Sequence, residues 1–453
     1  MNDSHRDKLQ RLNQVMLAGF AAIALSLIFW SVLRAGSLLQ RDDNPRLVEA
    51  ELRIQRGQIV DRNGVVLAEN GGTLARQERL YPLAEAGAAL GYYSFRHGTA
   101  GVEERFDTLL RGEPDNALIR WSNQLFHLPQ RGHDVQLTVD AAWQETAVSL
   151  LTDHQTALLL LELPTTTSDP ALVRTLVSQP SFDPNALDDI FDSLVEDETA
   201  PLLNRVTQGQ YQPGLLLQPF LVAAAVEDGL IRLSDITDNP NRPVPVGNQI
   251  TRCTTRPPES ATWANVVTHR CPGPMLDLAD RLGVGGLDQI FTNFGLTITP
   301  TLALNTETAV SDPTADPLLA GIGQENLTVT PLQLGLATAA LGNNGRLPPL
   351  QLVTHTRSPN GAWQPITIEN STKSAVAAFT AQDIREIWLQ HNNILEYSRL
   401  VLSGPDGSTN SWYLALTPAN QPRYALVIVL ENSDNLQEVE KIGREFLEVI
   451  SGQ

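Results

Sequence analysis

From Leu12 to Leu33 the chain carries no charged residue, and most of this stretch is apolar. A helix of about 20 apolar residues crosses the hydrocarbon core of a bilayer. The stretch therefore predicts a transmembrane anchor at residues 12–34, preceded by a tail of residues 1–11. A cleavable signal peptide is the alternative, but its apolar region would span only roughly 7–15 residues, and Leu33-Arg34-Ala35 offers no small-x-small cleavage site. We therefore expect an uncleaved helix, with Trp30 at the membrane interface.

Charge does not decide which way this helix points. Three basic residues precede it and three follow it closely: Arg6, Lys8 and Arg11, then Arg34, Arg41 and Arg46. Because basic residues mark the cytoplasmic side, this count is a tie, and the short tail favours a large outer part. The formal net charge of −19 argues against a nucleic-acid partner, since phosphate binding needs clustered basic side chains.

The chain has two cysteines, Cys253 and Cys271, both on the expected outer side. An oxidising compartment favours a disulfide between them, and closing a loop of this length would stabilise the fold by about 3 kcal/mol in the chain-entropy model. Two unpaired buried thiols remain the alternative.

Hydrophobic patterns predict individual strands and helices. Residues Arg53–Asn70 place apolar residues on both sides of Asn63-Gly64, a strong turn signal, and so predict a hairpin. The continuous apolar run Thr156–Leu163 is typical of a central strand. Residues Ser411–Asn432 predict a further strand hairpin, and the apolar spacing in residues 436–450 predicts a closing helix.

Three stretches carry a resemblance to a known family. Residues Arg56–Ala68 read R-G-x-I-x-D-R-N-G-x-x-L-A, residues Tyr211–Phe220 read YQPGLLLQPF, and residues Gly321–Gly345 read GIGQENLTVTPLQLGLATAALGNNG. They resemble the short form of the class B, monofunctional, penicillin-binding proteins. The resemblance implies a mixed α+β fold: one N-terminal transmembrane helix, a β-rich pedestal at residues 35–130, and a transpeptidase-like domain at residues 131–453. The last domain is similar to serine β-lactamases, with a five-stranded antiparallel sheet flanked by helices.

The first catalytic motif of that family is Ser-x-x-Lys, in which the lysine takes the proton of the serine nucleophile. The matching positions hold Leu215 and Gln218. Leucine has no nucleophilic atom, and an amide does not accept that proton near neutral pH. No Ser-x-x-Lys occurs elsewhere, because the chain has only three lysines and none has serine three residues earlier: Lys8, Lys373 and Lys441.

The second motif of the family is Ser-x-Asn, and the resemblance places Arg270-Cys271-Pro272 there. Arginine is too basic to relay a proton, and proline has no side-chain hydrogen bond to offer. The third motif is Lys-Ser/Thr-Gly on a strand. Anchored on Trp412, its counterpart is Pro405-Asp406-Gly407, where only the glycine remains. Asp406 would put negative charge where the family binds a carboxylate, and Pro405 removes a backbone donor.

The resemblance therefore predicts a catalytically inactive homologue, anchored by one helix in a bacterial cell membrane with most of the chain outside the cytoplasm. We expect a scaffold or regulatory role in peptidoglycan synthesis or cell division. The family implies partners among cell-wall synthesis or division proteins, such as a polytopic glycosyltransferase, with peptidoglycan as a further partner. No cofactor or metal site is expected.

Two other functions stay open at this point. One is an active penicillin-binding D,D-transpeptidase with an unorthodox site, for which the candidate side chains are Thr207, His269, Ser403 and Ser408. The other is a sensor that binds muropeptide or antibiotic noncovalently. Because Leu215–Leu217 and Asp406 predict an apolar or acidic cleft, we expect it to bind anionic β-lactams weakly.

Overall fold

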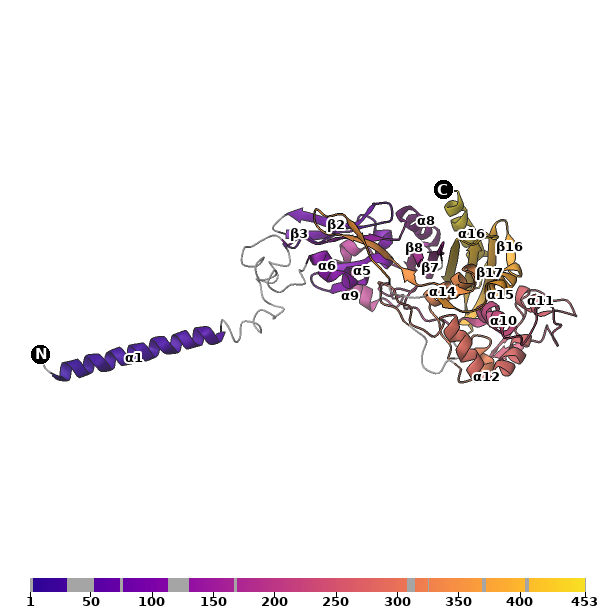
Figure 1. Cartoon of the computed structure of the whole chain (residues 1–453), viewed down its shortest axis with the longest axis horizontal. Helices are drawn as coiled ribbons and strands as arrows, with labels where there is room; N and C mark the ends of the chain where they lie inside the picture. The colour runs from indigo at the N-terminus through magenta and orange to yellow at the C-terminus, as the bar shows by residue number, and fades with distance from the viewer. Residues whose placement is uncertain are drawn as a thin grey trace. The chain divides into compact units, whose positions relative to one another are not determined.

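The computed structural model describes residues 3–30, 53–73, 76–112, 130–166, 169–307, 314–324, 326–368, 372–403 and 407–452. Contacts divide the chain into two units. The first consists of residues 1–55, 71–78 and 116–130, and the second of residues 56–70, 79–115 and 131–453. The second unit holds the largest sheet and the candidate site (Figure 1).

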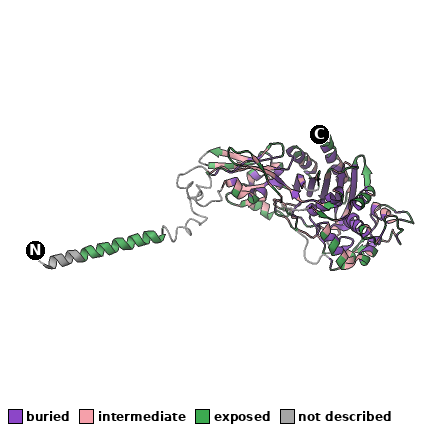
Figure 2. Cartoon of the chain, viewed as in Figure 1, coloured by how far each residue is buried: buried purple, intermediate pink, exposed green. Residues whose placement is uncertain are grey.

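The first unit contains helix α1, Asp3–Ile28. Its segment Arg11–Ile28 has 18 residues, a mean hydropathy of 1.5 and no burial (Figure 2). Within the described residues, it is the one helix long and apolar enough to cross a membrane. This is consistent with the anchor predicted at residues 12–34, of which residues 31–34 lie outside the described part.

The hairpin predicted around Asn63-Gly64 is present. Strand β1, Ile59–Val60, pairs antiparallel with β2, Val66–Thr73. The carboxylate of Asp61 fixes the turn, because it accepts hydrogen bonds from the backbone N–H of Asn63 and Val65 at 2.7 and 2.8 Å. The spacing of Asp61 and the turn residues thus has a local structural cause.

These strands belong to a six-stranded sheet with the order β14-β13-β6-β1-β2-β3. Its other members are β3 Arg76–Leu80, β6 Asp134–Leu137, β13 Val353–Arg357 and β14 Trp363–Pro365. The predicted boundary between a pedestal at 35–130 and a second domain at 131–453 stays a prediction. It runs through one sheet, because three strands of that sheet come from beyond residue 130.

The largest sheet has seven strands in the order β12-β8-β7-β19-β18-β17-β16. The expected five-stranded antiparallel sheet forms its centre: β8 Ala171–Gln179, β7 Thr156–Glu162, β19 Tyr424–Leu430, β18 Ser408–Thr417 and β17 Ile394–Ser403. Two short strands extend the edges: β12, Leu350–Gln351, is parallel to β8, and β16, Leu389–His391, is antiparallel to β17.

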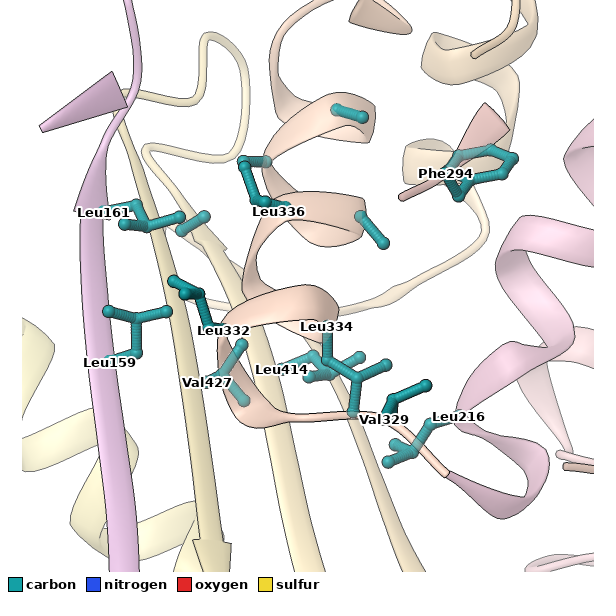
Figure 3. Close-up of a cluster of buried hydrophobic side chains, with 14 of the residues drawn as sticks. Leu159, Leu161, Leu216, Phe294, Val329, Leu332, Leu334, Leu336, Leu414 and Val427 are labelled. Atoms are coloured by element: carbon teal, nitrogen blue, oxygen red, sulfur yellow. The ribbon is translucent and has the colours of Figure 1, made fainter. Parts of the chain in front are cut away.

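Side chains of the central strands alternate between two apolar layers. On β7, Leu158 and Leu160 join a buried cluster with α8, Ala141–Leu151, and α16, Leu436–Ser451. Leu159 and Leu161 lie on the opposite face and point toward α14, Pro331–Gly342 (Figure 3). Burial on both faces explains why the sequence of β7 is apolar throughout.

Shorter elements surround the two sheets. Near the six-stranded sheet they are η2 Ala84–Ala86, α4 Gly87–Leu90, β4 Gly91–Ser94, β5 Gly98–Ala100, α5 Gly101–Arg105 and α6 Asp107–Arg111. Further along they are η3 Pro184–Ala186, α9 Leu187–Glu196, β9 Val244–Val246, β10 Gln249–Thr251, α11 Trp263–Thr268, α12 Gly273–Asn293, α13 Pro317–Ala320, β11 Arg346–Leu347, β15 Lys373–Ser374 and α15 Ala378–Glu386.

Candidate functional site

The first motif lies where the η4 turn, Gly214–Leu217, leads into helix α10, Gln218–Glu227. Gly214 has φ +54° and donates its N–H to the carbonyl of Gly323 at 2.8 Å. A Cβ on Gly323 would lie 2.2 Å from the Gly214 oxygen, so both glycines permit this close approach of two backbones. The turn points Leu215 into the protein, where only 3% of it is exposed.

Gln218 is fully buried and makes hydrogen bonds at both ends of its amide. Its Nε2 donates to the carbonyl of Cys271 at 2.6 Å, and its Oε1 accepts from the hydroxyl of Tyr397 at 2.8 Å. That hydroxyl also lies 3.2 Å from the carbonyl of Leu215. Burial raises the pKa of Tyr397, so the phenol stays neutral and remains a donor. Gln218 therefore links two segments of the fold and has no free acceptor for a proton.

The second motif lies in the loop between α11 and α12. Arg270 adopts φ +54° and places its guanidinium carbon 4.9 Å from the centroid of the Tyr397 ring. Pro272 caps the start of α12. The structure joins Cys253 to Cys271, as the sequence predicts. It thus brings together the predicted positions Leu215, Gln218 and Arg270, which are linked through Tyr397 and the Cys271 carbonyl.

The third motif, expected at Pro405-Asp406-Gly407, stays a prediction. Pro405 and Asp406 lie outside the described residues. Gly407 precedes β18, and a Cβ on it would lie 2.5 Å from the side-chain nitrogen of Gln249, so its neighbour is the β9–β10 hairpin.

The strand that borders Leu215 is β17 instead. Tyr397 of this strand bonds the Leu215 carbonyl, and a Cβ built on Gly214 would lie 2.8 Å from Val401. Because β17 ends at Ser403, residues 405–407 follow the strand that borders Leu215.

Arg399 is a site residue that the sequence analysis missed. It lies between Tyr397 and Val401 on the same face of β17 and is 8% exposed. Its guanidinium donates to the hydroxyl of Thr254 and to the carbonyls of Arg270 and Arg252, the last two at 3.3 and 2.9 Å. The pKa of Arg399 is lowered to about 10: burial is the largest cause, Tyr397 opposes it, and Arg270 adds to the lowering. The available sequence signal was a single arginine at a position that, by the alternation of side chains along an apolar strand, should face inward.

The space beside Leu215 is a cavity of about 20 Å³. Its lining residues are Gly214, Leu215, Val246, Thr251, Ile322, Gln324 and Arg399–Leu402. Pockets that hold drug-sized ligands measure about 300–1,000 Å³, so this cleft is closed to them. Its described lining combines apolar side chains with the polar Thr251 and Gln324 and the cation Arg399. Asp406 lies outside the described residues, so the expected apolar or acidic character of the cleft stays a prediction.

The other candidate nucleophiles are not part of this cluster. The Ser408 hydroxyl donates to the Ser403 carbonyl at the end of the β17–β18 hairpin. Thr207 is fully buried. His269 Nδ1 lies 2.7 Å from the hydroxyl of Thr255 on the protein surface. Burial, with a smaller effect of Arg270, lowers the pKa of His269, so its imidazole is neutral near pH 7.

The Thr255–His269 pair has the spacing of a nucleophile and its base. Among the described residues, no carboxylate bonds the second nitrogen of this histidine to orient it. A search of the same residues finds no cluster of histidine, cysteine and carboxylate side chains able to hold a metal ion.

Two family models match the chain. Residues 171–391 match the penicillin-binding protein transpeptidase domain, and residues 56–135 match the penicillin-binding protein A dimerisation domain.

Among curated relatives, the peptidoglycan D,D-transpeptidase PbpA of Mycolicibacterium smegmatis is 25% identical over 441 residues, covering 88% of this chain and 89% of that protein. PbpA of Mycobacterium tuberculosis is 25% identical over 469 residues, covering 94% and 93%. The peptidoglycan D,D-transpeptidase MrdA of Escherichia coli is 27% identical over 324 residues, covering 65% and 48%.

Solved structures share the fold. The crystal structure of PBPA from M. tuberculosis matches with a TM-score of 0.75 and 23% identity, over 87% of this chain and 99% of that one. The penicillin G acyl-enzyme complex of the same protein matches with a TM-score of 0.76 and 24% identity.

Proposed function

Because the chain belongs to the class B penicillin-binding proteins, we propose that it is a membrane-anchored homologue in peptidoglycan synthesis that has lost acyl transfer and acts as a scaffold or regulatory partner. One observation carries the loss of acyl transfer. The position of the nucleophile holds a buried leucine, and the position of its base holds a glutamine whose amide is bonded at both ends. Acyl transfer needs an activated nucleophile, and these two positions supply neither part of one.

The size of the cleft supports the same conclusion. A cavity of about 20 Å³ admits one water-sized occupant. The peptide strand or β-lactam that a transpeptidase acylates could enter only if β17, η4 and the β9–β10 hairpin moved apart. A noncovalent sensor of muropeptide or antibiotic faces the same barrier, so we rank it below a scaffold.

Covalent labelling tests the proposal. The full-length chain in detergent is incubated with a fluorescent penicillin and read by gel and by intact mass. We expect no adduct under conditions that label PbpA of M. tuberculosis, for which a penicillin G acyl-enzyme complex is known. A stoichiometric adduct would refute the proposal, and the modified peptide would identify the nucleophile.

The second candidate function is an active transpeptidase with an unorthodox site. The surface pair Thr255–His269, 2.7 Å apart, is the observation that favours it. Its matched variant is Thr255→Ala, which removes the hydroxyl and keeps the histidine. An adduct that the wild-type chain forms and Thr255→Ala does not would establish this function in place of the scaffold.

A scaffold role requires a surface that contacts a partner protein. Helix α1 is apolar along residues 11–28 and exposed in the isolated chain, as a helix in a membrane would be. We propose that it meets a membrane-embedded cell-wall synthesis or division protein, such as a polytopic glycosyltransferase. In the same detergent preparation, a stoichiometric membrane partner should co-purify with the chain even though no penicillin is bound.

A further inference from the structure

A second cavity, of about 90 Å³, lies apart from the closed cleft. It is lined by α4, β4, the junction of β5 and α5, the end of β8 with the loop after it, residues 201–208 and residues 304–305. All these segments belong to the second unit of the chain. The cavity shares no lining residue with the cleft beside Leu215, so it is a separate candidate for a binding site.

Hydrogen bonds join the walls of this cavity to each other. The side-chain nitrogen of Asn204 donates to the carbonyl of Ala88 in α4 at 2.8 Å. The hydroxyl of Ser178 in β8 donates to the carbonyl of Leu203 at 2.9 Å. The segment 201–208 is thus bonded to both neighbouring walls, and the cavity is formed before any ligand arrives. A site formed in advance lowers the ordering cost of binding.

Several polar groups of the lining have no partner. The hydroxyl of Thr207 is fully buried and makes no hydrogen bond. Within the described residues, the side-chain amide of Gln208 and the hydroxyl of Tyr92, both half-buried, also make none. Leaving buried donors and acceptors without partners is unfavourable. A ligand with hydroxyl or amide groups would supply the missing partners.

The charges around the cavity favour an uncharged ligand. None of the described residues that line it carries a charge, and a buried ion needs a counter-charge. The carboxylate of Glu104 lies 3.5 Å from the side-chain nitrogen of Asn305, which is one of the lining residues. Burial, with a smaller effect of Glu104, raises the pKa of Tyr92. An anionic ligand would therefore meet a nearby negative charge and no cation in the lining.

The lining also offers aromatic surface. The rings of Tyr92 and Phe182 pack edge to face with their centroids 5.9 Å apart, and aromatic rings bury apolar C–H surface well. The amide of Gln208 donates and accepts at once, which suits two adjacent hydroxyls or one amide of a ligand. A sugar ring combines these features, because it carries hydroxyls around its edge and C–H groups on its faces.

The volume sets the size of the ligand. A single water molecule needs roughly 10–15 Å³ measured in the same way, so about 90 Å³ takes several heavy atoms. Drug-sized ligands need about 300–1,000 Å³. The cavity is therefore large enough for the greater part of one sugar ring and too small for a chain of them.

We propose that this cavity binds one uncharged sugar ring. The amide of Gln208 and the hydroxyl of Tyr92 bond the polar groups of the ring, and Phe182 contacts its C–H face. The proposal does not depend on the scaffold role or on penicillin labelling, because no residue of the three motif positions lines this cavity.

Saturation-transfer NMR of the full-length chain in detergent tests the proposal, with N-acetylglucosamine as the probe. We expect a dissociation constant on the order of 1 mM, as for other small, weakly held ligands. Glucosamine, which carries an ammonium group, and glucuronate, which carries a carboxylate, should bind at least about tenfold more weakly. This comparison uses the wild-type chain alone, so it stands whether or not a variant folds.

Gln208→Leu removes the amide at nearly constant volume and should weaken binding of N-acetylglucosamine about 3–10-fold, as the loss of one or two hydrogen bonds predicts. Gln210→Leu is the matched control. Gln210 is exposed and outside the lining, and its side chain accepts a hydrogen bond from the Thr328 hydroxyl at 2.9 Å. Its loss should leave the affinity unchanged. Thermal unfolding of both variants confirms that they are folded.

Three results would overturn the proposal. They are no binding of N-acetylglucosamine at about ten times the expected dissociation constant, equal binding of the charged sugars, and an affinity that Gln208→Leu leaves unchanged or that Gln210→Leu lowers equally. The disaccharide N,N′-diacetylchitobiose distinguishes two sources of the ring. Binding at least as tight as that of the single sugar would identify the terminal unit of a glycan, and exclusion of the disaccharide would identify a free sugar.

Discussion

At the scale of single residues, Gln218 and lysine differ in what they can bond. A glutamine amide donates and accepts at once, so it can bind the Cys271 carbonyl and the Tyr397 hydroxyl together. A lysine in its place would donate to Cys271 but could not accept from Tyr397. It would also add a positive charge near Arg270 and Arg399, which already lack a carboxylate partner.

We therefore expect the double variant Leu215→Ser with Gln218→Lys not to be acylated. The new serine would lie in a cavity of about 20 Å³ that excludes the substrate, and the new lysine would lie beside two arginines. Fluorescent-penicillin labelling and intact mass of the variant, alongside the wild-type chain, provide the measurement. Stoichiometric labelling would mean that the two side chains alone had disabled the site.

The candidate site was predictable where its residues sit inside contiguous motifs. Leu215 and Gln218 lie between the retained Pro213-Gly214 and Pro219-Phe220, and the structure keeps that turn and helix. Arg399 was not predictable in the same way, because β17 meets η4 only through the fold of the sheet. The expected position of the third motif, residues 405–407, depends on the length of the loop before Trp412, for which the sequence has no local signal.

At the scale of elements, the Arg-Gly motif near residue 56 has a structural cause. The buried carboxylate of Glu103 in α5 bonds Arg56 at 2.8 Å and Arg79 at 2.6 Å. A Cβ on Gly57 would lie 1.8 Å from the His133 carbonyl, so a side chain does not fit there. This cluster joins the hairpin segment to α5 and β3.

We expect Glu103→Gln to lower the free energy of unfolding by roughly 3–5 kcal/mol at pH 7, because the buried Arg79 loses its counter-charge and the buried Arg56 keeps only Asp107. Burial by itself raises the pKa of Glu103, but Arg79 and Arg56 outweigh it and hold the pKa below its ordinary value. Its contribution is therefore full above the unfolded carboxyl pKa and is lost as the pH falls through the lower folded value.

Urea unfolding at pH 7 and in acid measures this effect. The difference between wild type and Glu103→Gln should be large at pH 7 and should shrink in acid. The neighbouring, exposed Glu104→Gln is the control and should change stability by less than about 0.5 kcal/mol. Equal effects of the two substitutions would contradict this prediction, because they would show that the burial and ion pairs of Glu103 add nothing to the free energy of unfolding.

Strands and hairpins that a local sequence pattern defines were predictable. Which strands pair with each other in a sheet was harder to predict. The hairpin at Asn63-Gly64, the central strand β7 and the strands β18 and β19 follow from turn residues and apolar spacing. The pairing of β6 with β13, which lie more than 200 residues apart in the chain, has no local signal. For the same reason the sequence alone does not show that strands from both sides of residue 130 join one sheet.

At the scale of the whole molecule, the disulfide bears on which side of the membrane the large part of the chain lies. The charged residues do not decide this. Basic residues flank the apolar segment equally on its two sides, so the positive-inside count does not orient α1. A disulfide persists outside the reducing cytoplasm. Because Cys253 and Cys271 are bonded in the folded chain, we propose that everything after α1 lies outside the cytoplasm.

Thiol trapping in living cells tests this orientation. Cells producing the full chain are quenched with a membrane-permeant alkylating reagent, and the protein is analysed by mass before and after reduction. We expect no modified cysteine before reduction and two afterwards. A variant lacking residues 1–30, which would stay in the cytoplasm, should instead present two free thiols from the start, and Cys253→Ser with Cys271→Ser should give none in either state. Two free thiols in the full-length chain would contradict this orientation, because they would place the large part of the chain in the reducing compartment.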